Sequence, residues 1–318
     1  MNTVTFKNKP YSLTSEESIL SCLLRHGIQH PNSCQIGVCQ SCLIKATDGE
    51  INPSWQEGLP ETLKAQKYFL ACLAKPSTDI ELASPDASEC EVEAKIICIE
   101  RLNYNVLQIR LRVDNPGNWL PGQYLNLINS EEIIRSYSVA NIPSQDGYIE
   151  LHIKIIENGS MGKWVLETAQ VSTPVRIRGP FGTCYYYNPD KLSFDMLLAG
   201  TGTGLAPLVG IIKNALSQGH KGSITLVHGG LIDDDIYYVD ELETLAAIFP
   251  NFHYIPCVLQ SQGHYQEVSI NQLVLNHLNN PSETRVYICG PKETTYKLKT
   301  SAFLAGVPSK FIFSDGFL

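Results

Sequence analysis

Residues 34–42 read Cys34-Gln-Ile-Gly-Val-Cys39-Gln-Ser-Cys42, and Cys72 follows after 29 further residues. This C-x4-C-x2-C…C spacing is typical of a [2Fe-2S] site of the plant type, in which four thiolates hold two irons. Gly37 suits the tight loop, because glycine tolerates positive φ and lets backbone N–H groups approach the bridging sulfides. The stretch therefore predicts an iron–sulfur centre with Cys34, Cys39, Cys42 and Cys72 as its metal ligands, in a chain that handles single electrons.

Zinc and disulfide bonds are the alternative uses of these cysteines. Zinc sites favour paired C-x2-C knuckles, and this run contains one such pair, Cys39 and Cys42. The ten cysteines are spread over a long chain, unlike the dense cysteines of a secreted disulfide scaffold. Cys22 and Cys98 lie in apolar patterns and are expected in the core, whereas Cys90 is expected near the surface.

Length and charge limit the class of protein. A chain of 318 residues is expected to form two or three domains. A net charge of −8 and a pI near 5.5 argue against nucleic-acid binding, which normally needs a basic face. The charge-free stretches 196–212 and 244–266 are too short or too interrupted by proline and polar residues to span a membrane. A soluble, cytoplasmic protein is expected.

Hydrophobic patterns divide the chain into segments 1–88, 92–190 and 191–318. In the first, Val4 and Phe6 alternate with polar residues as in a strand, and Thr14 to Glu17 fits a capping box for a helix over 18–25. The small, polar stretch 83–89 is expected to be a linker. In the second segment, alternating patterns at 94–99, 106–113, 123–127, 149–155 and 174–178 predict an antiparallel barrel, with one helix at 162–171.

The third segment has a different pattern of apolar residues. Apolar strands are predicted at 196–199, 224–227, 254–258, 286–289 and 311–313, with helical stretches between them. Such alternation of strand and helix indicates a parallel, nucleotide-binding sheet. Overall the sequence predicts a multi-domain α+β and α/β protein.

A glycine-rich turn at Gly200-Thr-Gly202-Thr-Gly204 links the first of these strands to a helix. Glycines let the backbone approach a pyrophosphate, and the helix N-terminus offers free N–H groups. The turn departs from G-x-G-x-x-G because Leu205 occupies the last glycine position, and no Walker A lysine follows. Alone, this motif is as consistent with a structural turn as with a nucleotide site.

The segment His228 to Asp235, predicted as a loop, would face the adenosine end of a dinucleotide. An NADP 2′-phosphate needs Arg or Lys there, and this segment has three acids and no base. NADH is therefore favoured. The alternative is that Asp233 to Asp235 simply form a solvated helix cap.

In the second segment, Arg135-Ser-Tyr137-Ser138 follows a strand predicted at 132–134. Arginine suits a phosphate diester, a tyrosine face suits a flat aromatic ring, and a serine hydroxyl can bond a ring nitrogen. Backbone N–H groups at 159–163 could bind a phosphate. Tyr185 to Tyr187 is expected to be a packing cluster rather than an adenine platform.

The order of these parts resembles the ferredoxin–NAD(P)+ reductase superfamily. The motifs concerned are Arg135 to Ser138, then Gly202 to Pro207, then Cys289-Gly-Pro291. With the N-terminal cysteines, the whole chain resembles the single-chain reductases of bacterial oxygenases, including those of Rieske dioxygenases and of methane or phenol monooxygenases. The resemblance implies a β-grasp ferredoxin domain, a six-stranded FAD-binding barrel and a Rossmann-like NAD-binding domain.

The resemblance also implies roles for individual residues. Arg135 would pair with the FAD pyrophosphate, Tyr137 would stack on the isoalloxazine, and Ser138 would approach the flavin N5. Cys289 and Gly290 would line the nicotinamide site, and Phe317 would shield the flavin. The remaining cofactor-binding residues would be Ser136, His152, Ile153, Lys154, Met161 and Gly162 for FAD, and Gly202, Thr203 and Gly204 for the NADH pyrophosphate.

Three positions depart from common members of the family. Gly162 replaces a serine, so that only backbone contacts to phosphate remain there. Leu231 replaces an arginine, which again favours NADH over NADPH. Gln40 replaces a small residue of the cluster loop, but this position is not a ligand.

The expected activity is NADH-dependent electron transfer through FAD and the [2Fe-2S] cluster to an oxygenase component or its ferredoxin. No general acid or base is required, because the cofactors supply the chemistry. One alternative keeps this redox chain but serves a deoxysugar dehydratase. A second is an electron-transfer subunit of a permanent complex that no longer oxidises NADH directly.

Overall fold

The computed structural model describes residues 2–32, 34–85, 91–116, 119–188 and 193–317. The chain packs as two compact units. The first comprises residues 1–93, 126–136 and 175–179, and the second comprises residues 94–125, 137–174 and 180–318. Part of the predicted linker, and Cys90, lie outside the described residues.

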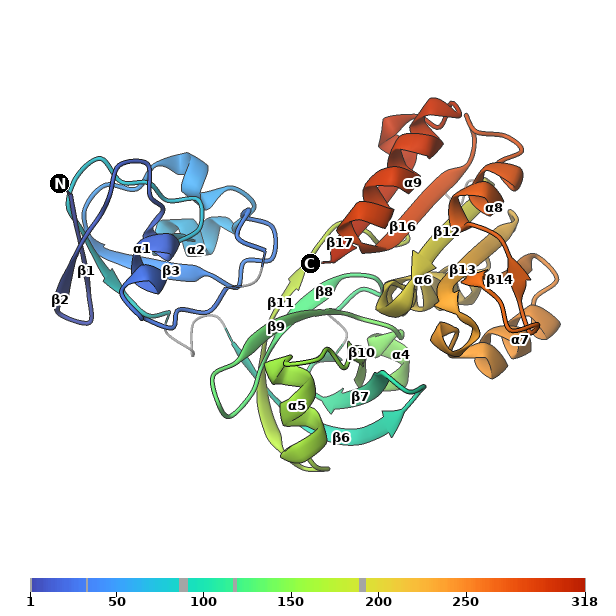
Figure 1. The fold of residues 1–318 in the computed structure, drawn as a ribbon, viewed down its shortest axis with the longest axis horizontal. Coiled ribbons are helices and arrows are strands. Elements are labelled where there is room, and N and C mark those ends of the chain that lie inside the picture. Colours follow the sequence, from blue (N-terminus) through green and yellow to red (C-terminus); the bar gives the residue numbers. More distant parts are fainter. Residues whose placement is uncertain (1, 33, 86–90, 117–118, 189–192, 318) are drawn as a thin grey trace. The chain divides into compact units, whose positions relative to one another are not determined.

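A five-stranded mixed sheet with the order β2-β1-β5-β3-β4 lies at the N-terminal end of the chain (Figure 1). Strand β1 pairs antiparallel with β2 and parallel with β5, as expected for the predicted β-grasp fold. The strands are β1 (Thr3–Phe6), β2 (Lys9–Ser12), β3 (Leu43–Asp48), β4 (Tyr68–Leu70) and β5 (Ile80–Ala83). The helices are α1 (Ile19–Arg25), η1 (Pro53–Gln56) and α2 (Glu61–Ala65).

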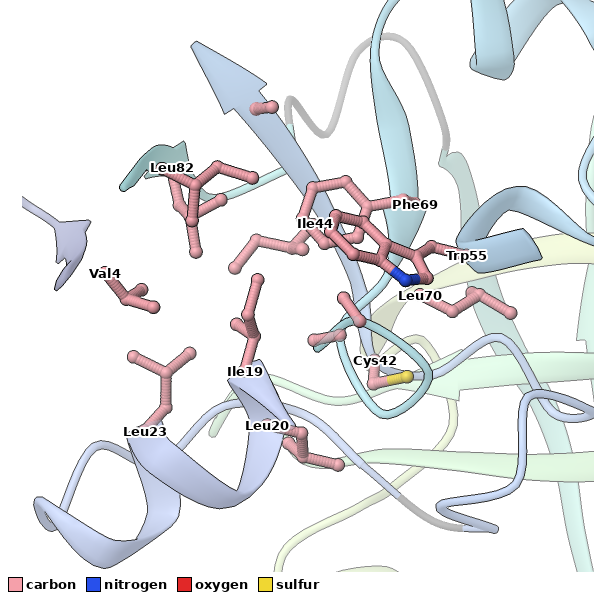
Figure 2. Close-up of a cluster of buried hydrophobic side chains, with 14 of the residues drawn as sticks. Val4, Ile19, Leu20, Leu23, Cys42, Ile44, Trp55, Phe69, Leu70 and Leu82 are labelled. Atoms are coloured by element: carbon pink, nitrogen blue, oxygen red, sulfur yellow. The ribbon is translucent and has the colours of Figure 1, made fainter. Parts of the chain in front are cut away.

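The core of this part is apolar and continuous. Figure 2 shows Ile19 of α1 extending toward Ile44 of the sheet and Leu23 extending toward Val4, and Leu20 and Phe69 belong to the same buried cluster. Cys42 belongs to the same buried cluster, so one predicted metal ligand is anchored in the hydrophobic core. Burial of such side chains, at about 25 cal/mol per Å² of apolar surface, is what holds the loop ends in place.

Helix α1 was predicted correctly, but its cap was not. Ser18 is the N-cap, and its hydroxyl accepts a hydrogen bond from the Ser21 N–H. The predicted box residues form a turn before the helix instead, in which Thr14 donates from both N and Oγ1 to the Glu17 carboxylate. That carboxylate also pairs with Arg25 in the last turn of the helix, which holds it away from the helix N-terminus.

The second sheet is the predicted curled, antiparallel six-stranded sheet, with the order β10-β7-β6-β11-β8-β9 (Figure 1). Its strands are β6 (Val92–Arg101), β7 (Val106–Arg112), β8 (Tyr124–Ile128), β9 (Ile134–Ser138), β10 (Ile149–Lys154) and β11 (Pro174–Phe181). Two short helices accompany it, α4 (Pro143–Asp146) and α5 (Ser160–Glu167). Helix α5 replaces the helix predicted at 162–171. The motif Arg135 to Ser138 is itself strand β9 and does not follow a strand, contrary to prediction.

The third sheet has the order β15-β14-β13-β12-β16-β17 and is parallel throughout, as predicted. Its strands are β12 (Met196–Thr201), β13 (Ile224–Ile232), β14 (Phe252–Gln260), β15 (Gln266–Glu267), β16 (Arg285–Pro291) and β17 (Ile312–Phe317). The helices are η3 (Gly202–Gly204), α6 (Leu205–Ser217), η4 (Asp233–Asp235), α7 (Val239–Ile248), α8 (Ile270–Asn276), α9 (Lys292–Leu304) and η5 (Ser309–Phe311). Among the described residues, no helix combines the length and apolar character needed to cross a bilayer.

Candidate functional site

The loop between Cys34 and Cys42 is folded around its own sulfurs. The Cys34 N–H donates to the Cys39 sulfur at 3.3 Å, and the Cys39 N–H donates to the Cys34 sulfur at 3.2 Å. Gln35, Gly37 and Gln40 all have positive φ, between 55° and 84°. This left-handed backbone turns successive N–H groups inward, as a sulfur cluster requires.

The sheet brings the fourth cysteine to this loop. Strand β3 pairs antiparallel with β4, with Leu43 opposite Leu70, and the pairing continues as Ala71 N–H donates to the Cys42 carbonyl at 3.1 Å. Cys72 therefore follows directly, and the Cys42 and Cys72 side chains hydrogen-bond one another. The register of two strands, rather than sequence proximity, completes the set of four.

The four thiols form two pairs. The Cys39 thiol lowers the pKa of Cys34 to about 5, and the Cys42 thiol lowers the pKa of Cys72; each donating partner has a raised pKa. Within the described ranges, no three His, Cys, Asp or Glu side chains are grouped so that they could hold one metal ion. Two pairs suit two irons with two thiolates each and do not suit one tetrahedral zinc. The donor set fits a [2Fe-2S] cluster.

The structure explains why Gly37 and Gln40 occupy their positions in the loop. A Cβ at Gly37 would lie 2.7 Å from the Leu73 side chain, so the glycine permits close packing as well as positive φ. Gln40, which replaces a small residue, is buried and donates from Nε2 to the Gly58 carbonyl at 3.0 Å. Its extra length ties the loop to a neighbouring turn.

In the second unit, the glycine turn lies against the Cys289-Gly290 segment. Strands β12 and β16 are neighbours, with Gly200 opposite Cys289. A Cβ at Gly204 would lie 2.2 Å from the Cys289 carbonyl oxygen. Gly202 has φ of +53°, and Thr203 lies between the two glycines in η3. The structure thus brings together the residues predicted for the pyrophosphate and for the nicotinamide.

Strand β17 adds the C-terminal residues to this group. Its parallel pairing with β16 places Asp315 opposite Cys289 and Phe317 opposite Pro291. The Cys184 sulfur lies 3.8 Å from the Cys289 sulfur, and both cysteines are buried. Sequence reasoning missed Cys184, because 105 residues separate the two thiols and no spacing pattern joins them.

Strand β10 contributes three of the predicted FAD residues in different ways. Ile153 is fully buried. The His152 ring is also buried, at 3.0 Å from the Tyr237 hydroxyl and 3.4 Å from Glu150, so its side chain already has protein partners. Lys154 is exposed, and its amino group lies 4.0 Å from the Cβ position of Gly202. A cation beside a glycine turn suits a phosphate.

Strand β9 holds the Arg135 to Ser138 motif. Arg135 donates from Nη1 to the Ile134 carbonyl at 2.7 Å and remains half-exposed. Tyr137 is half-exposed and Ser138 is buried. Ser136 donates to Asn126 of strand β8 at 2.8 Å, and the motif alone gave no indication of this partner.

Helix α5 begins at Ser160, and no side chain caps its N-terminal N–H groups. Met161 is buried, whereas a Cβ at Gly162 would lie 3.3 Å from the Ile155 Cα. Any contact of Met161 and Gly162 with a phosphate therefore falls to the backbone.

The acidic segment is more ordered than the predicted loop. Strand β13 continues to Ile232, so residues 228–232 are strand and the turn begins at Asp233. Asp233 accepts hydrogen bonds from the Gln262 and His264 N–H groups, and Asp235 accepts from the Leu231 and Ile232 N–H groups and the Tyr104 hydroxyl. Asp235 therefore has a capping role at η4, as in the alternative interpretation, whereas Asp233 is buried and binds the turn at residues 262–264.

The tyrosines at positions 185–187 differ in their burial and contacts. Tyr186 is buried and its hydroxyl lies 3.1 Å from His220, whereas Tyr187 is exposed. All three line a cavity of about 480 Å³ with Trp119 and uncharged polar side chains.

Three family models match successive parts of the chain. Residues 4–77 match the 2Fe-2S iron–sulfur cluster binding domain, residues 93–186 the oxidoreductase FAD-binding domain, and residues 198–296 the oxidoreductase NAD-binding domain. These matches agree with the predicted cofactors, a [2Fe-2S] cluster, FAD and a nicotinamide dinucleotide.

Similar proteins cover almost the whole chain. The reductase component of the naphthalene 1,2-dioxygenase system of Pseudomonas putida is 27% identical, over 98% of this chain and 96% of its own length. The reductase subunit of an aromatic O-demethylase of Amycolatopsis is 30% identical, over 76% and 75%. A CDP-6-deoxy-L-threo-D-glycero-4-hexulose-3-dehydrase reductase of Yersinia pestis is 28% identical, over 95% and 93%. The crystal structure of an Amycolatopsis cytochrome P450 reductase has the same fold, with a TM-score of 0.70 at 24% identity over 100% and 99%.

Proposed function

Because this chain belongs to the family of single-chain ferredoxin–NAD(P)+ reductase components, we propose that it takes electrons from NADH and delivers them to an oxygenase component or its ferredoxin. The observation that carries the proposal is the coexistence of two built sites. Four paired thiols suit a [2Fe-2S] cluster, and a glycine turn packed on Cys289 suits a dinucleotide. When bound, FAD converts a two-electron hydride donor into a source of single electrons.

The residues of the chain bind and orient these groups. The Arg135 guanidinium would hold the FAD pyrophosphate, with Ser136 beside it, and the Tyr137 ring would cover the isoalloxazine. Ser138 is buried, as suits a hydroxyl that bonds a flavin nitrogen. Lys154 and the backbone of His152 and Ile153 would complete the flavin site, with the N–H groups at Met161 and Gly162.

On the nicotinamide side, the residues would hold the dinucleotide and set the distance between the nicotinamide and the flavin. Gly202, Thr203 and Gly204 let a pyrophosphate approach the backbone at the start of α6. Cys289 and Gly290 would contact the nicotinamide, and Phe317 would shield the reacting face. No side chain needs to exchange a proton in this scheme.

NADH is the proposed donor in preference to NADPH. Residues 228–235 contain three acids and no Lys or Arg. Leu231, where an arginine would meet a 2′-phosphate, is 54% exposed. A 2′-phosphate would therefore face negative charge without a partner.

The terminal acceptor has two candidates. The relatives act in dioxygenase and O-demethylase systems, which favours an oxygenase, while the similarity to a dehydrase reductase favours the deoxysugar alternative. We also propose a cytoplasmic location, because the ten cysteines are spread over a long chain, unlike those of a secreted disulfide scaffold.

The direct test uses the isolated chain loaded with FAD and cluster. NADH should drive rapid reduction of ferricyanide and cytochrome c, at a rate far above that with NADPH. This result would exclude a subunit that depends on a permanent complex. Failure of NADH to reduce the bound flavin would refute the proposal.

A further inference from the structure

Asn126 is a buried amide in an apolar strand. Strand β8 reads Tyr-Leu-Asn-Leu-Ile, every residue of it is buried, and Asn126 has no exposed surface. Burying an amide among apolar side chains costs free energy unless its hydrogen bonds are made. Asn126 makes them to the cysteine loop, 87 residues away in the sequence, and to strand β9, 10 residues away, all within the compact unit of residues 1–93, 126–136 and 175–179.

One end of the amide binds the cysteine loop. The Asn126 Nδ2 donates to the Cys39 carbonyl at 3.2 Å. The other end faces strand β9, where the Ser136 hydroxyl donates to the Asn126 Oδ1 at 2.8 Å. Asn126 thus connects the peptide of one cluster ligand to the residue between Arg135 and Tyr137.

A third hydroxyl joins the network. The Ser41 Oγ lies 3.5 Å from the Asn126 Oδ1 and also hydrogen-bonds the Cys39 sulfur. A serine hydroxyl has one proton to donate. The amide oxygen can accept two hydrogen bonds, but Ser136 donates to it at 2.8 Å whereas Ser41 lies at 3.5 Å. The Ser41 contact with the amide is therefore the weaker one, and its single proton favours the Cys39 sulfur.

We propose that Asn126 is a positioning residue for electron transfer between the flavin and the cluster. It fixes the Cys39 peptide against the flavin-binding strand, and through Ser136 it directs the Ser41 hydroxyl onto the ligand sulfur. This inference rests on the proposed function. Hydrogen bonds to ligand sulfurs raise the reduction potential of iron–sulfur clusters, so the network also makes the cluster a better electron acceptor.

The first test is the cluster potential, measured by dithionite titration so that no NADH is needed. Ser41→Ala should lower the potential, because a donor to the Cys39 sulfur is lost. Ser136→Ala should lower it as well, because the freed Asn126 oxygen draws the Ser41 proton away from the sulfur. The double variant should shift the potential no further than Ser41→Ala alone. Potentials equal to wild type in both single variants would overturn the proposal.

The second test uses Asn126→Leu, which keeps the branched shape of the side chain, adds volume and removes the bridge. Amides at 38–43 should exchange hydrogen faster, and flavin-to-cluster transfer should be slower than in wild type, because the bridge that holds the Cys39 peptide is lost. Reduction of the flavin by NADH should stay unchanged. Asn141→Leu is the matched control, since Asn141 is also buried and hydrogen-bonds Asp146, Tyr148 and Glu150.

The outcomes separate the two proposals. Unchanged exchange at 38–43 together with wild-type transfer in Asn126→Leu would refute the positioning role while leaving the proposed function intact. If Asn126→Leu fails to hold its cluster, the potential of Ser136→Ala decides alone. A wild-type protein whose flavin ignores NADH would instead refute the proposed function.

Discussion

Gly204 and Cys289 approach so closely that a side chain at 204 would collide with the protein backbone. A Cβ there would lie 2.2 Å from the Cys289 carbonyl oxygen and 2.7 Å from the Gly290 Cα. The turn expected to hold a pyrophosphate and the segment expected to meet the nicotinamide are therefore one packed structure. Neither can move without the other.

Gly204→Ala should disrupt this contact. Overpacking typically costs about 1–3 kcal/mol, so the variant should unfold at lower denaturant concentration. NADH should also reduce the flavin much more slowly, while dithionite still reduces the cluster. Stopped-flow absorbance measures both. Gly219→Ala is the control, because its φ of +73° brings strain of about 1–2 kcal/mol but nothing lies within 4 Å; a loss of NADH reduction there would discredit the interpretation.

Tyr137→Ala should weaken FAD binding. An aromatic stacking contact contributes about 0.5–1.5 kcal/mol, so the dissociation constant should rise up to about 10-fold. Fluorescence titration of the FAD-free protein measures this constant. Tyr137→Phe retains the ring and should bind FAD nearly as wild type. Equal affinity in Tyr137→Ala would remove the stacking role.

Leu231→Arg should admit NADPH. One charge-assisted hydrogen bond to a 2′-phosphate is worth about 1.5–3 kcal/mol, which corresponds to a rise of about 10-fold or more in kcat/KM for NADPH. The exposed position should tolerate the change without loss of stability. Leu231→Gln controls for polarity without charge. An unaltered NADPH preference would mean that the ribose lies elsewhere.

His228 should make the second unit sensitive to acid. Full burial lowers its pKa from 6.5 to about 3, and its Nδ1 lies 3.1 Å from the Tyr254 hydroxyl. Because the pKa of His228 is lower in the folded than in the unfolded protein, the neutral ring contributes to folding stability above about pH 6.5. This contribution is lost as the pH falls from about 6.5 toward 3, since the unfolded chain then binds a proton that the folded protein does not. His228→Asn should show a shallower decline of unfolding free energy over this window in urea titrations. Parallel pH profiles for the two proteins would contradict the assignment.

Local patterns in the sequence were enough to predict the cysteine site and the two kinds of sheet. The spacing of Cys34, Cys39 and Cys42 reflects a single loop, and strand periodicity reflects which face is buried. The glycine turn was also predicted from a local pattern. Its close contact with Cys289 was not, because that contact depends on the pairing of β12 with β16.

The features that could not be predicted depend on partners distant in the sequence. The Cys184–Cys289 contact and the Asn126 bridge join segments more than 80 residues apart, and no periodicity encodes them. The capping error at Thr14 has a local origin instead, since the Glu17 carboxylate pairs with Arg25, eight residues away at the end of the helix. Side-chain competition for hydrogen bonds decides such details after the chain has folded.

The central claim is that electrons from NADH reach a cluster held by the four cysteines through a separately bound flavin. The most direct measurement is an anaerobic NADH titration of wild type and Cys42→Ser, followed by flavin absorbance and by EPR. Wild type should show flavin reduction and the EPR signal of a reduced [2Fe-2S] cluster, and the control Cys22→Ser, a buried core cysteine, should match it. Cys42→Ser should keep flavin reduction and lose the EPR signal. A cluster signal that persists in Cys42→Ser, or flavin that NADH no longer reduces there, would contradict the account.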